Sequence, residues 1–107
     1  MPREKILVVD TDLDSLSRIY LALIHRRFKT EACIDADKIP ERLLKFKPAI
    51  IVLGHKEYTN LGKKLKTPAI VLSEKDDPAS IQLNYGDIHL KKPIHASQLI
   101  KAVEMMI

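Results

Sequence analysis

The chain has 107 residues, of which 46% are hydrophobic and 30% are charged, a balance that excludes a disordered or fibrous protein. This length fits one domain with one hydrophobic core. The 18 basic and 14 acidic side chains give a net charge of +4, and the bases are spread over several segments, so nucleic-acid binding is permitted by the composition but not indicated by it.

The N-terminal third of the chain predicts a strand, a helix and a second strand. The apolar run 6–9 ends at Asp10, a pattern typical of a strand buried on both faces of a parallel sheet. Asp12 or Asp14 is suited to cap the helix that follows, which has an arginine near its end. Residues 30–34 are a weaker strand candidate. The apolar positions at helical spacing are Leu16, Ile19, Tyr20 and Leu23.

The middle of the chain predicts a short helix between two more strand candidates. Pro40 fits the first turn of this helix, and Pro48 ends it before the apolar run 49–53. The next strand candidate is 69–72. Residues 60–65, between these two runs, have only a weakly helical pattern.

The C-terminal part predicts a fifth strand and a last helix. The strand candidate is 88–90, and Leu99, Val103 and Ile107 are spaced to form the inner face of the helix. Residues 78–85 are weakly helical. Strands that alternate with helices predict an α/β fold, in which helices cover both faces of an open parallel sheet.

Cysteine content and the N-terminal residues favour a cytoplasmic protein. Cys33 is the sole cysteine of the sequence, so it has no partner for an internal disulfide, which favours a reducing compartment. The run 6–9 is too short for a signal peptide or a membrane-spanning helix. We therefore expect one domain over residues 1–107, without membrane association.

Polar residues stand at the ends of four predicted strands, where ligands bind in open parallel sheets. These ends read Asp10-Thr11-Asp12, Gly54-His55, Ser73-Glu74 and Lys91-Lys92-Pro93.

Three motifs give the chain a resemblance to the response-regulator receiver family. They are Ile-Leu-Val-Val-Asp at 6–10, Pro-Ala-Ile-Val-Leu-Ser at 68–73 and Leu-Lys-Lys-Pro at 90–93. The resemblance covers nearly the whole chain and implies a flavodoxin-like five-stranded parallel sheet in the order 2-1-3-4-5. It also implies that Asp10 is the first metal-binding acid, that Ser73 is the switch hydroxyl, and that Lys92 is the phosphate-contacting lysine, joined to Pro93 by a cis bond.

The sequence departs from the family pattern at two positions of this site. Thr11 stands where the family has its second acid, although Asp12 follows directly. Gly54 stands where the family has its phosphorylated aspartate. An acyl phosphate needs a carboxylate nucleophile, and one assured carboxylate does not hold magnesium by itself, so we expect neither phosphorylation at position 54 nor a metal site. The stretches 54–73 and 73–92 are shorter than is usual in the family, which predicts shortened third and fourth helices.

Several of these residues can be explained by a structural role as well as by a functional one. Lys92 opposite Asp10 is expected to form an ion pair that tethers the fifth strand, with a bound anion as the alternative. Ser73 is expected to cap its strand end. His55 is disfavoured as a phosphate acceptor, because strand geometry would turn its side chain away from the site. The family often has a rotating aromatic residue at the position of His89, which makes His89 either part of a partner-binding face or an exposed strand residue.

These observations favour an interaction module that is not an enzyme and needs no cofactor. The three glycines form no phosphate-cradling loop. We predict a pseudo-receiver that binds a signalling protein, or an output domain of its own, through a face with His89 and Lys91. A homodimer through the fourth helix, fifth strand and last helix is one arrangement that the family suggests. A nucleic-acid-binding α/β domain is an alternative, but a nucleic-acid partner is disfavoured because aromatic residues are only 5% of the sequence and offer no evident stacking platform. A phosphorelay protein that uses Asp10, Asp12 or His55 as acceptor also stays open.

Overall fold

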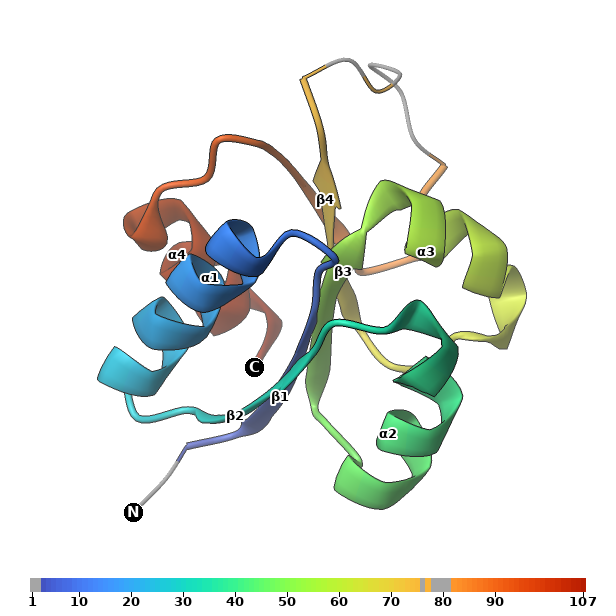
Figure 1. The fold of residues 1–107 in the computed structure, drawn as a ribbon, viewed down its shortest axis with the longest axis horizontal. Helices are drawn as coiled ribbons and strands as arrows, with labels where there is room; N and C mark the ends of the chain where they lie inside the picture. The colour runs from blue at the N-terminus through green and yellow to red at the C-terminus, as the bar shows by residue number, and fades with distance from the viewer. Residues whose placement is uncertain (1–2, 76, 78–81) are drawn as a thin grey trace.

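A computed structural model describes residues 3–75, 77 and 82–107 of the protein. Five strands form one sheet, and every pair of neighbouring strands is parallel (Figure 1). Their spatial order is β2-β1-β3-β4-β5, which confirms the predicted flavodoxin-like order. The strands are β1 Lys5–Val9, β2 Lys29–Cys33, β3 Ile50–Gly54, β4 Ala69–Ser73 and β5 Ile88–Lys91.

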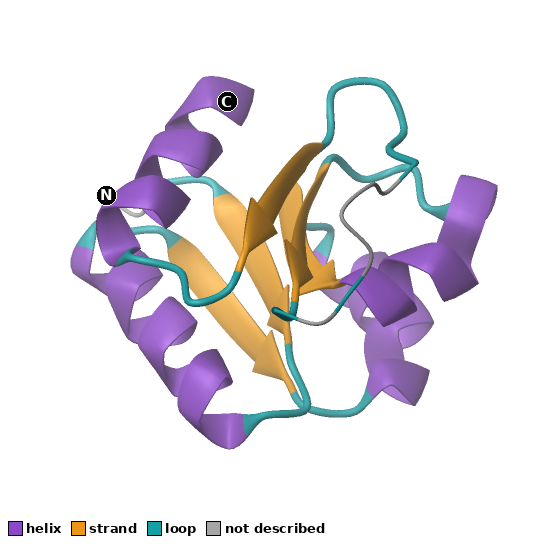
Figure 2. Ribbon diagram, turned by 90° about the horizontal axis from the view of Figure 1, so that it is seen from above, coloured by secondary structure: helices purple, strands orange, loops and turns teal. Residues whose placement is uncertain are grey.

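Helices cover both faces of the sheet, as predicted. The helices α1 and α4 lie on one face, and α2 and α3 lie on the other (Figures 1 and 2). Short 3-10 turns at Ala36–Lys38 and Gly62–Lys64 precede α2 and follow α3. The helices are α1 Leu13–His25, α2 Ile39–Phe46, α3 His55–Leu61 and α4 Ala96–Met106. None of the helices in residues 3–75, 77 and 82–107 is long and apolar enough to cross a membrane.

The two faces of the sheet have separate cores because strand side chains alternate in direction. Ile6 and Val8 of β1 contact the cluster beneath α1 and α4, whereas Leu7 and Val9 contact the cluster beneath α2 and α3. All four side chains are fully buried. A fully buried aliphatic side chain contributes about 1.5–3 kcal/mol, so the central strands hold the sheet and position the residues at their ends.

The first helix begins at the predicted cap. The carboxylate of Asp12 accepts a hydrogen bond from the backbone N–H of Asp14 at 3.1 Å. At the other end, the backbone N–H of Phe28 donates to the carbonyl of Leu23 at 3.2 Å, and Arg27 lies in the left-handed region with φ 69°. This is the usual geometry of a helix end, with arginine at a position where glycine is preferred.

The second helix also ends as predicted. Pro40 lies in its first turn, and the helix ends at Phe46, before Pro48. Lys47 closes it in the left-handed region with φ 52°. Two helices that end at the same edge of the sheet therefore have a basic residue in a left-handed conformation.

Three expectations at the element ends are wrong. The third helix begins at His55, not near residue 60, because Gly54 both ends β3 and caps the helix. Ile107 is 47% exposed instead of lying on the inner face of α4, because that residue follows the last helical turn. Of the predicted helix at 78–85, residues 78–81 lie outside the described residues, and residues 82–85 are not helical. The third helix is short, as predicted, at seven residues.

A polar network anchors the segment before β5 to α3. The hydroxyl of Tyr58 donates to Oδ2 of Asp87 at 2.6 Å and accepts from the backbone N–H of Asn84 at 2.7 Å. The other carboxylate oxygen of Asp87 accepts from the N–H of Ala69 at 2.9 Å. Tyr58 is 4% exposed. Burial raises the pKa of Tyr58, the hydrogen bond from the N–H of Asn84 lowers it, and the hydrogen bond to Asp87 with the charge of that residue raises it, so the pKa stays above its usual value.

Candidate functional site

The ends of β1, β3 and β4 and the residue after β5 meet in an open hollow at one edge of the sheet. Because parallel strands all end at the same edge, residues far apart in the sequence become neighbours there. The hollow contains most of the residues predicted for the site. Its lining includes Asp10, Thr11, Gly54, His55, Glu57, Glu74 and Lys92.

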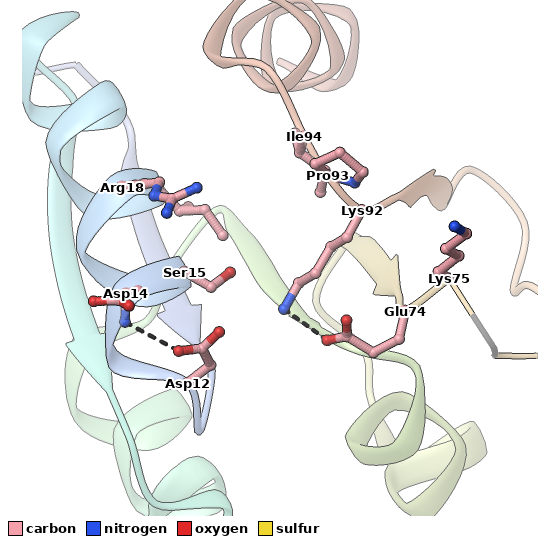
Figure 3. A pocket seen from close by; sticks show the side chains of 10 residues that line it. Asp12, Asp14, Ser15, Arg18, Glu74, Lys75, Lys92, Pro93 and Ile94 are labelled. Atoms are coloured by element: carbon pink, nitrogen blue, oxygen red, sulfur yellow. Dashed lines mark hydrogen bonds and ion pairs between the residues drawn. The ribbon is translucent and has the colours of Figure 1, made fainter.

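Lys92 forms two ion pairs across this hollow. Its Nζ lies 3.0 Å from Oδ2 of Asp10 and 3.0 Å from Oε1 of Glu74 (Figure 3 shows the second pair). The side chains of Lys92 and Asp10 are 17% and 10% exposed, whereas that of Glu74 is 66% exposed. The predicted tether between Asp10 and Lys92 is therefore confirmed, and the partnership with Glu74 was not foreseen.

Two opposing effects act on the pKa of Lys92. Burial lowers it, but hydrogen bonds to the carboxylates of Asp10 and Glu74, together with their negative charges, outweigh burial and leave the pKa above its usual value. The ammonium form is therefore the stable form of this side chain in the folded protein.

Glu57 lies beside the glycine that replaces the acceptor. A β-carbon added at Gly54 would lie 3.2 Å from Oε2 of Glu57. The backbone of Gly54 is extended, with φ −73° and ψ 160°, so it would accept any residue. Glu57 is the third residue of α3, a position where glutamate commonly reaches back toward the cap of a helix. The sequence interpretation missed Glu57 because it placed the start of this helix too late.

The acids near Asp10 do not fit a magnesium ion. Oδ1 of Asp10 accepts the backbone N–H of Asp12 at 3.0 Å, and Oδ2 bonds Lys92. The side chain of Asp12 caps α1, and Thr11 is exposed. Within residues 3–75, 77 and 82–107, no group of three or more His, Cys, Asp or Glu side chains is placed to hold a metal. Magnesium needs several oxygen ligands in near-octahedral geometry, which this arrangement does not provide.

A second hollow lies between the start of α1 and the segment after β5 (Figure 3). Asp12 and Asp14 stand on one side of it, and Glu74 and Lys92 stand on the other. Lys92 and Glu74 therefore line both hollows. The peptide bond between Lys92 and Pro93 is cis, as the family resemblance implied.

Ser73 and His89 form a contact that the sequence did not predict. Oγ of Ser73 lies 2.7 Å from Nε2 of His89, and the Ser73 side chain is fully buried. The predicted role of Ser73 as a cap of its strand end is therefore wrong. Its hydroxyl bonds the side chain of a residue on the neighbouring strand, whereas a capping hydroxyl would bond the backbone at the end of its own strand. His89 is half-buried, so the expectation of an exposed strand residue is wrong; its ring turns toward Ser73. Lys91 is exposed and is paired with Ser73 in the strand register.

The strand geometry expected at His55 was also wrong. His55 lines the hollow, with Gly54 and Lys92, because the chain leaves the strand conformation at this residue and enters α3. The alternation of strand side chains, which would have turned His55 away, no longer applies there.

Comparisons with known proteins identify the fold. No protein-family model matches the chain, and no curated protein sequence matches it. Its structure resembles a response-regulator signal receiver domain from Bermanella marisrubri, with a TM-score of 0.74 and 20% identity over 95% of this chain and 96% of that one. A response regulator from Desulfuromonas acetoxidans has a TM-score of 0.77 and 21% identity over 96% and 95%.

A longer protein contains the same fold as one part. NtrX from Brucella abortus, solved in complex with ADP, has a TM-score of 0.78 and 19% identity over 99% of this chain but only 26% of its own. The present chain thus spans about a quarter of NtrX. Together these similarities show that the chain has the receiver fold.

Proposed function

We propose that this chain is a degenerate receiver, a signal-transduction module that takes no phosphoryl group at position 54 and works by binding another protein. The observation that supports this proposal is the set of side chains that line the hollow at Gly54. The position has no carboxylate, the carboxylate of Glu57 lies next to it, and Lys92 is already paired with Asp10 and Glu74.

Electrostatics in the hollow oppose a phosphoryl group. Glu57, Glu74 and Asp10 line the hollow together with Lys92. A phosphoryl group there would face these carboxylates, and like charges at close range are costly where solvent is partly excluded. Lys92 would also have to leave two carboxylates in order to bind the new anion. We infer a module of one domain over residues 1–107 that has no catalytic role.

The outer face of β5 supports the inference of a protein partner. β5 is an edge strand of the sheet, and Lys91 at its end is exposed. Among the described residues no strand pairs with the outer edge of β5, and such an edge is a template for another chain. We propose that His89 and Lys91 contribute to this face and that the partner is a signalling protein or an output domain of the same protein. A second copy of the chain, docked through β5 and α4, is the alternative occupant.

The first prediction concerns phosphorylation. The wild-type protein, incubated with acetyl phosphate and magnesium, is expected to gain no phosphoryl group in an intact-mass measurement, because position 54 has no nucleophile. A receiver with its acceptor aspartate serves as the positive control. A stable, stoichiometric gain would overturn the proposal, and mapping would then decide between Asp10, Asp12 and His55.

The partner is tested by affinity capture from the source cell with and without nuclease. Lys91→Glu and His89→Ala are compared with Lys38→Glu, a charge reversal at an exposed residue after β2. A nuclease-resistant protein that is retained by the control and lost by both face variants supports the module. Sedimentation of the same variants tests the homodimer, which requires a dimer that dissociates on Lys91→Glu. Equal capture by all three variants would exclude the β5 face.

A further inference from the structure

The edge of the sheet opposite the candidate site has a row of lysines. Each of four neighbouring strands has a lysine at its first residue or shortly before it: Lys29 for β2, Lys5 for β1, Lys47 for β3 and Lys66 for β4. Lys5 and Lys29 are opposite each other in the strand register, whereas Lys47 and Lys66 each lie three residues before their strands. We call the row, together with Arg26 and Arg27 beside it, the basic edge.

The charges of the basic edge are exposed and mostly uncompensated. All six side chains lie in exposed residues. In the part of the chain that the structure describes, none of the six forms a salt bridge with an acid. Nζ of Lys5 donates to the carbonyl of Phe46 at 3.3 Å, which leaves its charge in place. The nearby acids Glu4 and Glu104 are paired with Arg3.

A favourable interaction with helix ends explains some of the basic residues of this edge but not all of them. Cations near the end of a helix gain about 0.3–1 kcal/mol from its dipole, which favours Arg26, Arg27 and Lys47. Lys5 bonds the carbonyl of Phe46 at the end of α2 and so shares this reason, whereas Lys29 begins a strand and does not. Arg27 and Lys47 also occupy left-handed positions, where glycine would avoid a cost of about 1 kcal/mol. The edge has charge at positions where folding alone would favour another residue.

An exposed aromatic ring stands at the end of the row. Tyr85 is fully exposed, in the turn before β5. It lines a hollow together with Lys66, Pro68, Met105 and Met106, so the ring is close to the lysine that precedes β4. The hollow offers an aromatic face and apolar walls next to a cation.

We propose that the basic edge binds single-stranded nucleic acid, with phosphates along the lysine row and a base stacked on Tyr85. Cations gathered along one edge of the sheet suit a chain of phosphates, and an exposed ring beside them suits a base of any sequence. A membrane surface would favour a broad apolar face instead, and an acidic protein would have no need of the ring. This surface is separate from the hollow at Gly54, but the hollow at Tyr85 includes Ile88 of β5 and Met105 of α4 and so borders the β5 face. The sequence did not indicate it because the lysines are far apart along the chain.

The test is fluorescence anisotropy of the full chain with short labelled oligothymidylate and oligouridylate, over a series of salt concentrations. Four neutralised phosphates predict a slope of log affinity against log salt of about −3 for a single strand. Lys29→Glu/Lys66→Glu is expected to weaken binding more than tenfold and to flatten the slope by about 1.4. Lys38→Glu/Lys101→Glu makes the same charge change away from the basic edge and is expected to keep the slope.

A second pair of variants tests the base platform. Tyr85→Ala is expected to weaken binding about tenfold, whereas Tyr85→Phe keeps it, because stacking needs the ring and not the hydroxyl. Urea unfolding checks that each variant is folded. Failure of the wild type to bind either oligonucleotide at low salt overturns the proposal, as does an equal loss in the two charge-reversal pairs. Tighter binding to duplex than to single strands, or to vesicles of acidic lipid than to either oligonucleotide, also overturns it.

Discussion

Lys92 makes two ion pairs of very different weight. Its partner Asp10 is nearly buried, whereas Glu74 is two-thirds exposed. An exposed ion pair contributes about 0–1 kcal/mol because water and salt screen it. Removing one partner of a buried pair leaves a charge without compensation and costs about 3–5 kcal/mol. The Asp10 pair should therefore dominate the stability of this hollow.

We predict that Lys92→Met lowers the free energy of unfolding by about 3 kcal/mol, because it leaves Asp10 buried and unpaired. Glu74→Gln should change it by less than about 1 kcal/mol. Urea denaturation measures both. The double variant Asp10→Asn/Lys92→Met should recover much of the loss, because it removes both charges. Because Lys92→Met breaks both pairs, an equal cost for Glu74→Gln would mean that the Glu74 pair, and not the Asp10 pair, accounts for the loss.

Residues at strand ends were predictable where the family resemblance assigned their role. The strands β1 and β5 are separated by β3 and β4, so a shared edge of the sheet does not by itself bring Asp10 and Lys92 together; their pairing was predicted from the resemblance to receivers. The contact between Ser73 and His89 depends on which residues of β4 and β5 face each other, and the sequence does not contain that register. The position of Glu57 beside Gly54 follows from the start of α3 at His55, which the sequence pattern placed too late.

At the scale of elements, α3 has little reason to form by itself. It has seven residues and buries one side chain, that of Tyr58. Isolated helices of this length are not stable in water, so tertiary contacts must hold it. The helices α1, α2 and α4 were predictable because their apolar spacing, prolines or caps are local signals. The third helix has no such local signals. It begins at His55 because β3 ends at Gly54, directly before it.

We predict that Tyr58→Phe lowers the free energy of unfolding by about 1–2 kcal/mol at neutral pH, because Asp87 and the N–H of Asn84 each lose a partner. The pKa of Tyr58 is raised by burial, so the folded state holds this proton more tightly than the unfolded state. Its stabilising contribution is present in full below about pH 10 and is lost as pH rises through the folded pKa.

Urea denaturation of wild type and Tyr58→Phe over a pH series checks this. The difference between the two proteins should shrink above about pH 10. Tyr20→Phe, which removes a hydroxyl from the partly exposed Tyr20 of α1, is the control for the loss of a tyrosine hydroxyl elsewhere. A pH-independent difference for Tyr58→Phe would mean that its hydroxyl does not titrate as proposed.

At the scale of the whole molecule, a parallel sheet sorts residues by their place relative to strands. Residues after strands collect at one edge, which here holds Asp10, Glu74 and Lys92. Residues before strands collect at the other, which here holds the basic edge. The fold class and strand order were predictable from the pattern of apolar runs. The charge of each edge was not, because it appears only when segments far apart in the sequence are placed side by side.

The left-handed Lys47 links stability to the proposed binding surface. Glycine adopts this conformation without the cost that a side chain brings, so we expect Lys47→Gly to raise the free energy of unfolding by about 0.5–1 kcal/mol. The same change removes one cation of the row and should flatten the salt dependence of oligonucleotide binding by about 0.7. Greater stability combined with weaker binding is the pattern expected of a residue kept for function.

Lys47→Ala separates the two effects, because alanine removes the charge but keeps the conformational cost. It should weaken oligonucleotide binding as much as Lys47→Gly does, without the gain in stability. Urea denaturation and anisotropy on the three proteins give both quantities. If Lys47→Gly gained stability and bound oligonucleotides as the wild type does, the row would not use this lysine. If it lost stability, the backbone at Lys47 would not be under the strain that its positive φ implies, and the argument that charge outweighs folding at this edge would rest on Arg27 alone.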